Sequence, residues 1–205
     1  FGQAAVDIPF SGTDGTTNIS LAVGLDQAAT ACIDPALGES DLPPFPPAGV
    51  FDIRFDLAPY GCPALSTLND YRNAAAFPFS GSVQHLLWWQ VTTPGVSAIQ
   101  FTYNLPTGAS MTIVDNITGT LLNLGPFTGS GVATIPASYT AFGTKAYLNM
   151  TYTNIGGVAA PIFNIAPANL PFGNVEVGAT SMLQATVTNT GTAALVISNI
   201  VSSDA

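Results

Sequence analysis

Apolar and polar residues alternate along several short stretches of the chain. In residues 99–105 (IQFTYNL), Ile99, Phe101, Tyr103 and Leu105 fall on one face of an extended strand and polar residues fall on the other. Similar stretches, separated by turn residues, cover 17–25, 50–57, 85–93, 97–105, 110–115, 131–136 and 145–155. The 20 glycines and 16 prolines leave little room for long helices. The pattern predicts an all-β fold, a β-sandwich of the jelly-roll or immunoglobulin-like kind.

The alternation breaks at NIGGVAAPIF (154–163), where two glycines and a proline follow one another closely. We therefore expect an N-terminal β-sandwich domain over residues 1–158 and a second, partial β domain over residues 159–205. In the second domain, residues 183–205 predict a strand, a turn and another strand. Such a hairpin is marginal by itself and needs cover for its apolar residues, which are Leu183, Val187, Leu195, Val196, Ile197 and Ile200.

The source of that cover is the sharpest functional question in the sequence. If the chain ends at Ala205, we expect a neighbouring copy to supply a strand, with residues 4–12 (AAVDIPFSG) as donor through Val6, Ile8 and Phe10. Deleting residues 1–9 is then expected to leave a folded subunit that no longer polymerises. The competing account is a longer gene product that completes its own domain downstream.

Charge excludes some classes of partner. The chain has three basic residues against 12 acidic ones, and its net charge of -9 leaves nothing to neutralise a nucleic acid backbone. Charged residues make up only 7% of the chain and the mean hydropathy is +0.40. No run of 18 apolar residues is present, so we expect no membrane span, and the sequence does not begin with a signal peptide pattern.

The two cysteines, Cys32 and Cys62, lie in loop-like contexts rich in proline and glycine. They form either a disulfide or two free thiols, and we predict the disulfide. Such a bond favours an oxidising compartment, so we expect an extracellular or cell-surface location.

Residues 162–200 carry a resemblance to a known family. An apolar-Phe-Gly-x-Val-x-x-Gly segment is followed by Thr-Asn-x-Gly and then Leu-x-Ile, at Phe172, Gly173, Val175, Gly178, Thr188, Asn189, Gly191, Leu195 and Ile197. This resembles the first half of an immunoglobulin-like domain of the abnormal-spindle/hydin type. The resemblance implies a partial immunoglobulin-like sandwich that serves as a spacer or an assembly unit.

Residues 21–55 carry a looser resemblance. The stretch contains Asp-Pro-Ala-Leu-Gly-Glu (34–39) and Pro-Pro-Phe-Pro-Pro-Ala-Gly-Val-Phe-Asp (43–52). It is similar to a segment near the start of large secreted bacterial surface proteins, often those exported by the type IX system. Cys32 stands where that pattern has a small residue. The resemblance implies export and a surface location, and it implies no activity.

Candidate sites are few. His85 is the single histidine, and no nucleophile or metalloprotease motif accompanies it, so we expect a structural role and no enzymatic activity. Trp88 and Trp89 are adjacent on a predicted strand and therefore point to opposite faces. One is expected in the core, and the other either forms a platform for sugar stacking or packs beneath a loop.

Four acidic residues, Asp26, Asp34, Glu39 and Asp41, fall in one short loop region with no basic neighbour. They are either solvated loop charges or ligands of a calcium ion, and we expect no other cofactor. The proline-rich DLPPFPPAG (41–49) is either a polyproline ligand or a rigid connection.

Two functions remain open at this stage. The first is a structural subunit of an extracellular filament or surface polymer, whose partners are other copies of the chain. The second is a monomeric adhesion or glycan-binding module of a larger secreted protein. Low charge favours the first, because a subunit whose surface is covered by neighbours needs fewer charges for solubility.

Overall fold

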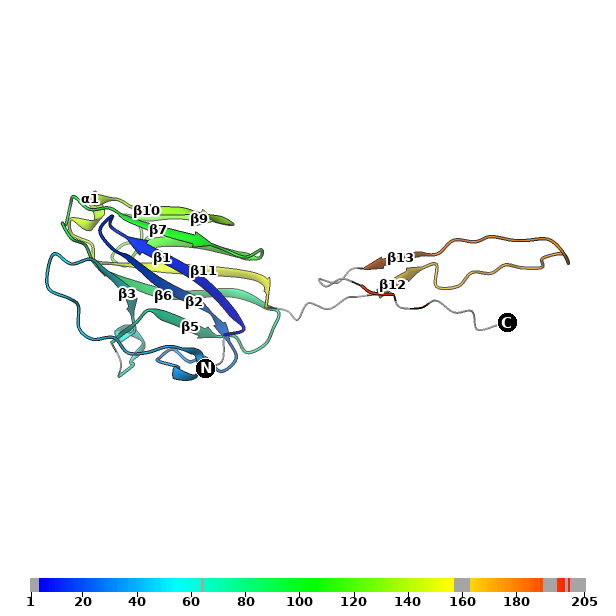
Figure 1. Cartoon of the computed structure of the whole chain (residues 1–205), viewed down its shortest axis with the longest axis horizontal. Helices are drawn as coiled ribbons and strands as arrows, with labels where there is room; N and C mark the ends of the chain where they lie inside the picture. Colours follow the sequence, from blue (N-terminus) through cyan, green and yellow to red (C-terminus); the bar gives the residue numbers. More distant parts are fainter. Residues whose placement is uncertain (1–3, 64, 157–162, 190–194, 198, 200–205) are drawn as a thin grey trace. The chain divides into compact units, whose positions relative to one another are not determined.

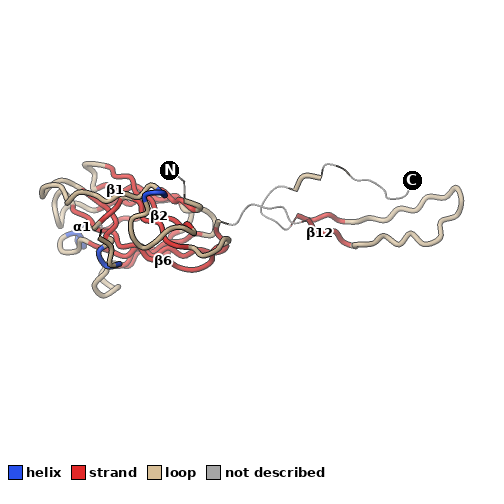
Figure 2. Tube along the Cα trace, turned by 90° about the horizontal axis from the view of Figure 1, so that it is seen from below, coloured by secondary structure: helices blue, strands red, loops and turns tan. Residues whose placement is uncertain are grey.

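The computed structural model describes residues 4–63, 65–156, 163–189, 195–197 and 199. The chain divides into two compact units, residues 1–157 and residues 158–205, which we term unit 1 and unit 2. Strands make up nearly all the regular structure (Figures 1 and 2). Two main sheets pack as a sandwich in unit 1, so the all-β sandwich predicted from the alternation is confirmed.

The first sheet of unit 1 has five strands in the order β10-β7-β1-β2-β5 (Figure 1). Neighbours are antiparallel except β2 and β5, which run parallel. The strands are β1 (Val6–Thr13), β2 (Asn18–Asp26), β5 (Asn69–Asn73), β7 (Ile99–Asn104) and β10 (Ser130–Ile135).

The second sheet has six antiparallel strands in the order β4-β3-β6-β11-β8-β9. These are β3 (Asp52–Asp56), β4 (Ser66–Thr67), β6 (Phe79–Gln90), β8 (Ala109–Asp115), β9 (Asn123–Phe127) and β11 (Lys145–Ile155). Helix is limited to short turns in the described part of the chain, namely η1 (Pro35–Leu37), η2 (Ala58–Tyr60) and α1 (Ala137–Thr140).

Alternation along the strands decides which side chains enter the core. In β7, Ile99, Phe101 and Tyr103 are buried and the residues between them are exposed. Phe101 stacks on Phe10 of β1, with 4.9 Å between the ring centroids. A continuous apolar cluster fills the space between the two sheets. Each fully buried large apolar side chain contributes about 1.5–3 kcal/mol, so unit 1 carries a core of its own.

The N-terminal segment corrects one expectation. β1 lies between β2 and β7, and Val6, Ile8 and Phe10 are buried in the core of their own unit. The segment is therefore not a free strand available for donation to another copy. β1 has a neighbour on each side and is therefore a central strand. Deleting residues 1–9 would remove half of it, so a folded subunit is not expected to remain.

Unit 2 contains a two-stranded antiparallel sheet of β12 (Phe163–Ala166) and β13 (Thr186–Asn189). The strand over 186–189 thus pairs with 163–166, which corrects the hairpin expected within 183–205. The described residues 195–197 and 199 are not in a strand, and Ile200 lies outside the described residues. Leu195 is half-buried, whereas large apolar side chains are exposed at Leu183, Val187, Val196 and Ile197.

Candidate functional site

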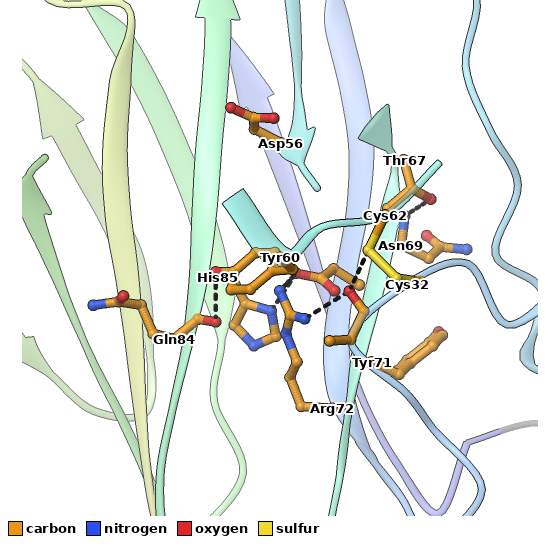
Figure 3. Close-up of polar contacts among 12 residues, drawn as sticks. Cys32, Asp56, Tyr60, Cys62, Thr67, Asn69, Tyr71, Arg72, Gln84 and His85 are labelled. Carbon is orange, nitrogen blue, oxygen red and sulfur yellow. Dashed lines mark hydrogen bonds and ion pairs between the residues drawn. A yellow bond between two sulfur atoms is a disulfide. The ribbon is translucent and has the colours of Figure 1, made fainter. Parts of the chain in front are cut away.

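A disulfide joins Cys32 to Cys62, so the predicted bond is confirmed. It links the loop after β2 to the turn after η2, with 5.4 Å between the Cα atoms, across 30 positions of sequence. Figure 3 shows the bond beside a group of polar side chains from β5, β6 and η2. The bond favours an oxidising environment.

The backbone next to the disulfide binds a buried cation. Ala31 precedes Cys32, and its carbonyl oxygen accepts a hydrogen bond of 3.1 Å from Nη1 of Arg72. The Arg72 guanidinium also lies over the ring of Tyr60, 4.1 Å from the ring centroid. Its Nη2 donates to Oδ2 of Asp70 at 2.8 Å. The disulfide therefore holds one of the groups that compensate the charge of Arg72.

Asp70 connects the two sheets of the sandwich. Its Oδ2 lies 2.7 Å from Nδ1 of His85 on β6, in the opposite sheet. The side chains of His85 and Asp70 are 0% and 1% exposed, and that of Arg72 is 9% exposed. We term these three residues the buried charge cluster. Removing such groups from water costs several kcal/mol per ion, which only close pairing offsets.

The buried charge cluster is closed to substrates. An Asp–His pair resembles the orienting half of a catalytic triad, but His85 has no exposed surface and a general base must reach the proton that it removes. Oδ1 of Asp70, Nε of Arg72 and Nε2 of His85 make no hydrogen bond within the described residues. The cluster accordingly fits a role in joining the two sheets.

Glu39 fixes the disulfide-bearing loop to the edge of β5. Its Oε1 accepts the backbone N–H of Tyr71 at 2.6 Å, and its Oε2 accepts the N–H of Asp34 at 2.8 Å. Burial raises the pKa of Glu39 to about 7, although the two amide hydrogen bonds act in the opposite direction. The carboxylate thus satisfies a donor of the edge strand.

Of the four acidic residues considered for calcium, Asp26, Asp34 and Glu39 bind backbone N–H groups. Asp26 accepts the N–H groups of Ala28 and Ala5, and Asp34 accepts the N–H of Thr30. Asp41 is exposed and lines a separate hollow described below. Among the described residues, no group of three acidic, histidine or cysteine side chains has the geometry to hold a metal. Backbone amides thus compensate three of the four carboxylates, and the calcium site stays an expectation.

Trp88 and Trp89 point to opposite faces of the six-stranded sheet. Trp89 is in the core, and its Nε1 donates to the carbonyl of Gly143 at 3.1 Å. Trp88 is half-buried on the outer face, where the edge of Phe45 meets it at 4.4 Å between ring centroids. Nζ of Lys145 lies 4.6 Å from the Trp88 centroid and pairs with Asp56.

Hollows adjoin Trp88 and Phe45. One, of about 200 Å³, is lined by Phe45, Trp88, Gln90, Pro94, Thr140 and Thr144 among others. Another, of about 450 Å³, is lined by Asp41, Leu42, Pro43, Phe45, Leu65 and Trp88 among others. Arg54 also lines the larger hollow, but Asp52 binds its guanidinium through both carboxylate oxygens. The hollows therefore present apolar rings, neutral polar groups and the Asp41 carboxylate, and the guanidinium of Arg54 is already paired.

Sequence reasoning missed Asp70 and Arg72. They lie two positions apart in NDYRN (69–73), so they share one face of β5, and that spacing was the available signal. Their partner His85 was found by its rarity, but nothing in the sequence linked it to Asp70.

No protein-family model matches the chain, and no curated protein or solved structure is similar to it at a level that shows a relationship. The two family resemblances therefore stay expectations. Within the described residues, no helix is long and apolar enough to cross a membrane.

Proposed function

We propose that the chain is a structural module of an extracellular assembly, which associates with other copies through the β12–β13 ribbon of unit 2. The observation that carries this proposal is the mainly apolar face of that ribbon, which is exposed in the described part of unit 2. Phe163, Ile165 and Val187 share one face and are 54%, 38% and 39% exposed. A two-stranded ribbon is marginal in water, so this face gains stability when another layer or strand covers it.

The register explains why the face is apolar. Ile165 is paired with Val187, whereas the alternate pair, Asn164 with Thr188, places polar side chains on the opposite face. Asn189, the cross-strand partner of Phe163, shares the face of Phe163, Ile165 and Val187, so this face is mainly apolar and the other is mainly polar. A strand or ribbon from another copy provides that layer in the proposed assembly.

Two further observations support the proposal. Charged residues are 7% of the chain, which suits a surface largely covered by neighbours. The Cys32–Cys62 disulfide suits an extracellular setting.

We expect Val187→Lys to prevent the formation of long assemblies. A lysine on the apolar face would have to be buried in the contact, which costs more than the contact provides. Light scattering of the full chain, whose subunit mass is 21.0 kDa, measures the effect. Thr188→Lys places the same charge on the polar face of the same strand and is expected to assemble like the unmodified chain.

Phe163→Ser tests the same face without a new charge and is expected to weaken association at least tenfold. A full chain that stays at 21.0 kDa at every concentration would contradict the proposal. A ribbon covered from elsewhere in the same polypeptide would give that result.

The hollows beside Trp88 support a second candidate function, the binding of neutral glycans. Aromatic rings with neutral hydrogen-bonding groups suit sugar rings, whereas the net charge of -9 and Asp41 in the lining of the larger hollow disfavour anionic ones. We expect Trp88→Ala to weaken binding of a neutral oligosaccharide about tenfold, measured by calorimetric titration. Tyr147→Ala removes an aromatic from β11 on the same outer face and is expected to change nothing. Equal binding by the unmodified and Trp88→Ala proteins would exclude this site.

A further inference from the structure

The sandwich of unit 1 has four edge strands, β10 and β5 in one sheet and β4 and β9 in the other. An edge strand presents unpaired N–H and C=O groups, and proteins usually prevent these from pairing with another chain. In unit 1, three of the edges are protected by identifiable devices.

Loops cover two of these edges. At β5, Glu39 binds the outward N–H of Tyr71, and the Asn69 side chain donates to the carbonyl of Gly38. β4 is only two residues long, and Leu42 donates its N–H to the carbonyl of Ser66. Both strands are therefore occupied by the chain's own proline-rich and disulfide-bearing segment.

β9 is interrupted instead of covered. Pro126 lies inside the strand and has no N–H to offer. The pairing of β9 with β8 also shifts register between Met111 and Ile113. Proline and irregular pairing are two common ways of blunting an edge.

β10 has none of these devices. It contains no charged residue and no proline, and its pairing with β7 is regular over six positions, from Ser130 to Ile135. Leu105 donates its N–H to the carbonyl of Gly129, and this phase of the antiparallel ladder turns the backbone groups of Ser130, Val132 and Thr134 outward. No hydrogen bond within the described residues ends on those backbone groups.

The surroundings in sequence are also free of charge. Between residues 86 and 144 the only charged residue is Asp115. It is buried, and backbone N–H groups, those of Thr118 and Leu122 among them, bind its carboxylate and hold its pKa well below the usual range. Val132, in the middle of β10, is 52% exposed. The edge therefore lacks the charges that usually oppose pairing with a second strand.

We propose that β10 pairs antiparallel with β10 of a second copy, about a two-fold axis through Val132. The edge is self-complementary in this register. Val132 meets Val132 of the second copy, and Ser130 meets Thr134, so the outward backbone groups form about six hydrogen bonds. The two five-stranded sheets become one continuous sheet.

This pairing adds a second contact to the proposed assembly, and its role in a filament rests on the proposed function. A two-fold contact alone closes as a dimer. One two-fold contact at β10 and a second contact between ribbons, on different surfaces of the same chain, leave a free surface at each end and generate an open filament.

The test uses the full chain with Val132→Lys, which places two lysines together on the axis. Val132→Pro removes an N–H that points away from β7, although it also fixes φ at this position, and serves as an uncharged second variant. Ser20→Lys is the matched control, because Ser20 lies in the same cross-strand row as Val132 but on β2, three strands away from β10. Sedimentation velocity measures the size of the assembly, and thermal unfolding checks that each variant folds.

We expect the unmodified chain and Ser20→Lys to form long assemblies, and both Val132 variants to stop at pairs joined by their ribbons. Val187→Lys should also stop at pairs, joined through β10, and the double variant Val132→Lys/Val187→Lys should be monomeric. Unchanged assembly of both Val132 variants, a monomeric Val187→Lys protein, or an equal loss in Ser20→Lys would each overturn the β10 pairing. Normal assembly of Val187→Lys with loss in Val132→Lys would overturn the ribbon contact alone.

Discussion

Asp70→Asn is expected to lower the free energy of unfolding by about 3–5 kcal/mol, because it leaves a buried guanidinium without its counter-charge. Asp70 Oδ2 contacts Arg72 on β5 and His85 on β6. One substitution therefore removes the carboxylate that both side chains contact. Urea unfolding followed by tryptophan fluorescence measures the change, and Trp89 in the core provides the signal.

Controls separate the lost charge pair from a general loss of packing. Asp41→Asn removes a carboxylate that is exposed and is expected to change stability by less than about 0.5 kcal/mol. Adding Arg72→Met to Asp70→Asn removes the isolated cation and should recover part of the loss. A loss below about 1 kcal/mol in Asp70→Asn, a typical value for exposed ion pairs, would show that the cluster is solvated.

Replacing both cysteines, as Cys32→Ser/Cys62→Ser, is expected to lower the free energy of unfolding by about 3–4 kcal/mol. The bond closes a loop across 30 positions, and restricting the unfolded chain by such a loop accounts for a stabilisation of this size. Thermal unfolding of the paired variant, compared with the unmodified protein under oxidising conditions, measures the difference.

The disulfide and Arg72 are expected to be coupled. Ala31 supplies a carbonyl to Arg72 beside Cys32, so opening the bond also weakens the buried charge cluster. Combining the serine pair with Arg72→Met should therefore cost less than the sum of the separate changes. Strict additivity would show that the bond acts on the unfolded chain alone, and equal stability with and without the bond would contradict the prediction altogether.

The sequence revealed which faces of the strands are buried more readily than which strands are neighbours. The alternation in IQFTYNL places Ile99, Phe101 and Tyr103 inward, as the structure does. The same kind of pattern in β1 is equally compatible with an edge, a donated strand or a central position, because alternation reports burial and not pairing. β5 (NDYRN) escaped notice because its buried side chains include an aspartate and an arginine.

The candidate site divides in the same way. The disulfide followed from the number and context of the cysteines, and the opposite faces of Trp88 and Trp89 followed from adjacency on a strand. The environment of Glu39 did not follow, because its partner Tyr71 is an amide 32 positions away and every residue offers such a donor. The sequence shows only that the carboxylates are close together in the chain, whereas the fold shows that Asp26, Asp34 and Glu39 bind backbone N–H groups.

The central place of β1 has a consequence for how the chain reaches its fold. β2 follows β1 at once in the sequence. The other neighbour of β1 is β7, in which Tyr103 pairs with Phe10 although it lies about 90 positions further along the chain. The first sheet cannot close until β7 and β10 are available, and therefore until most of unit 1 has been synthesised. Loop closure over such distances is entropically costly, and sandwiches of this kind fold in about milliseconds to seconds. During that interval the β1–β2 hairpin has an open side, which exposes the early chain to pairing with the wrong strand.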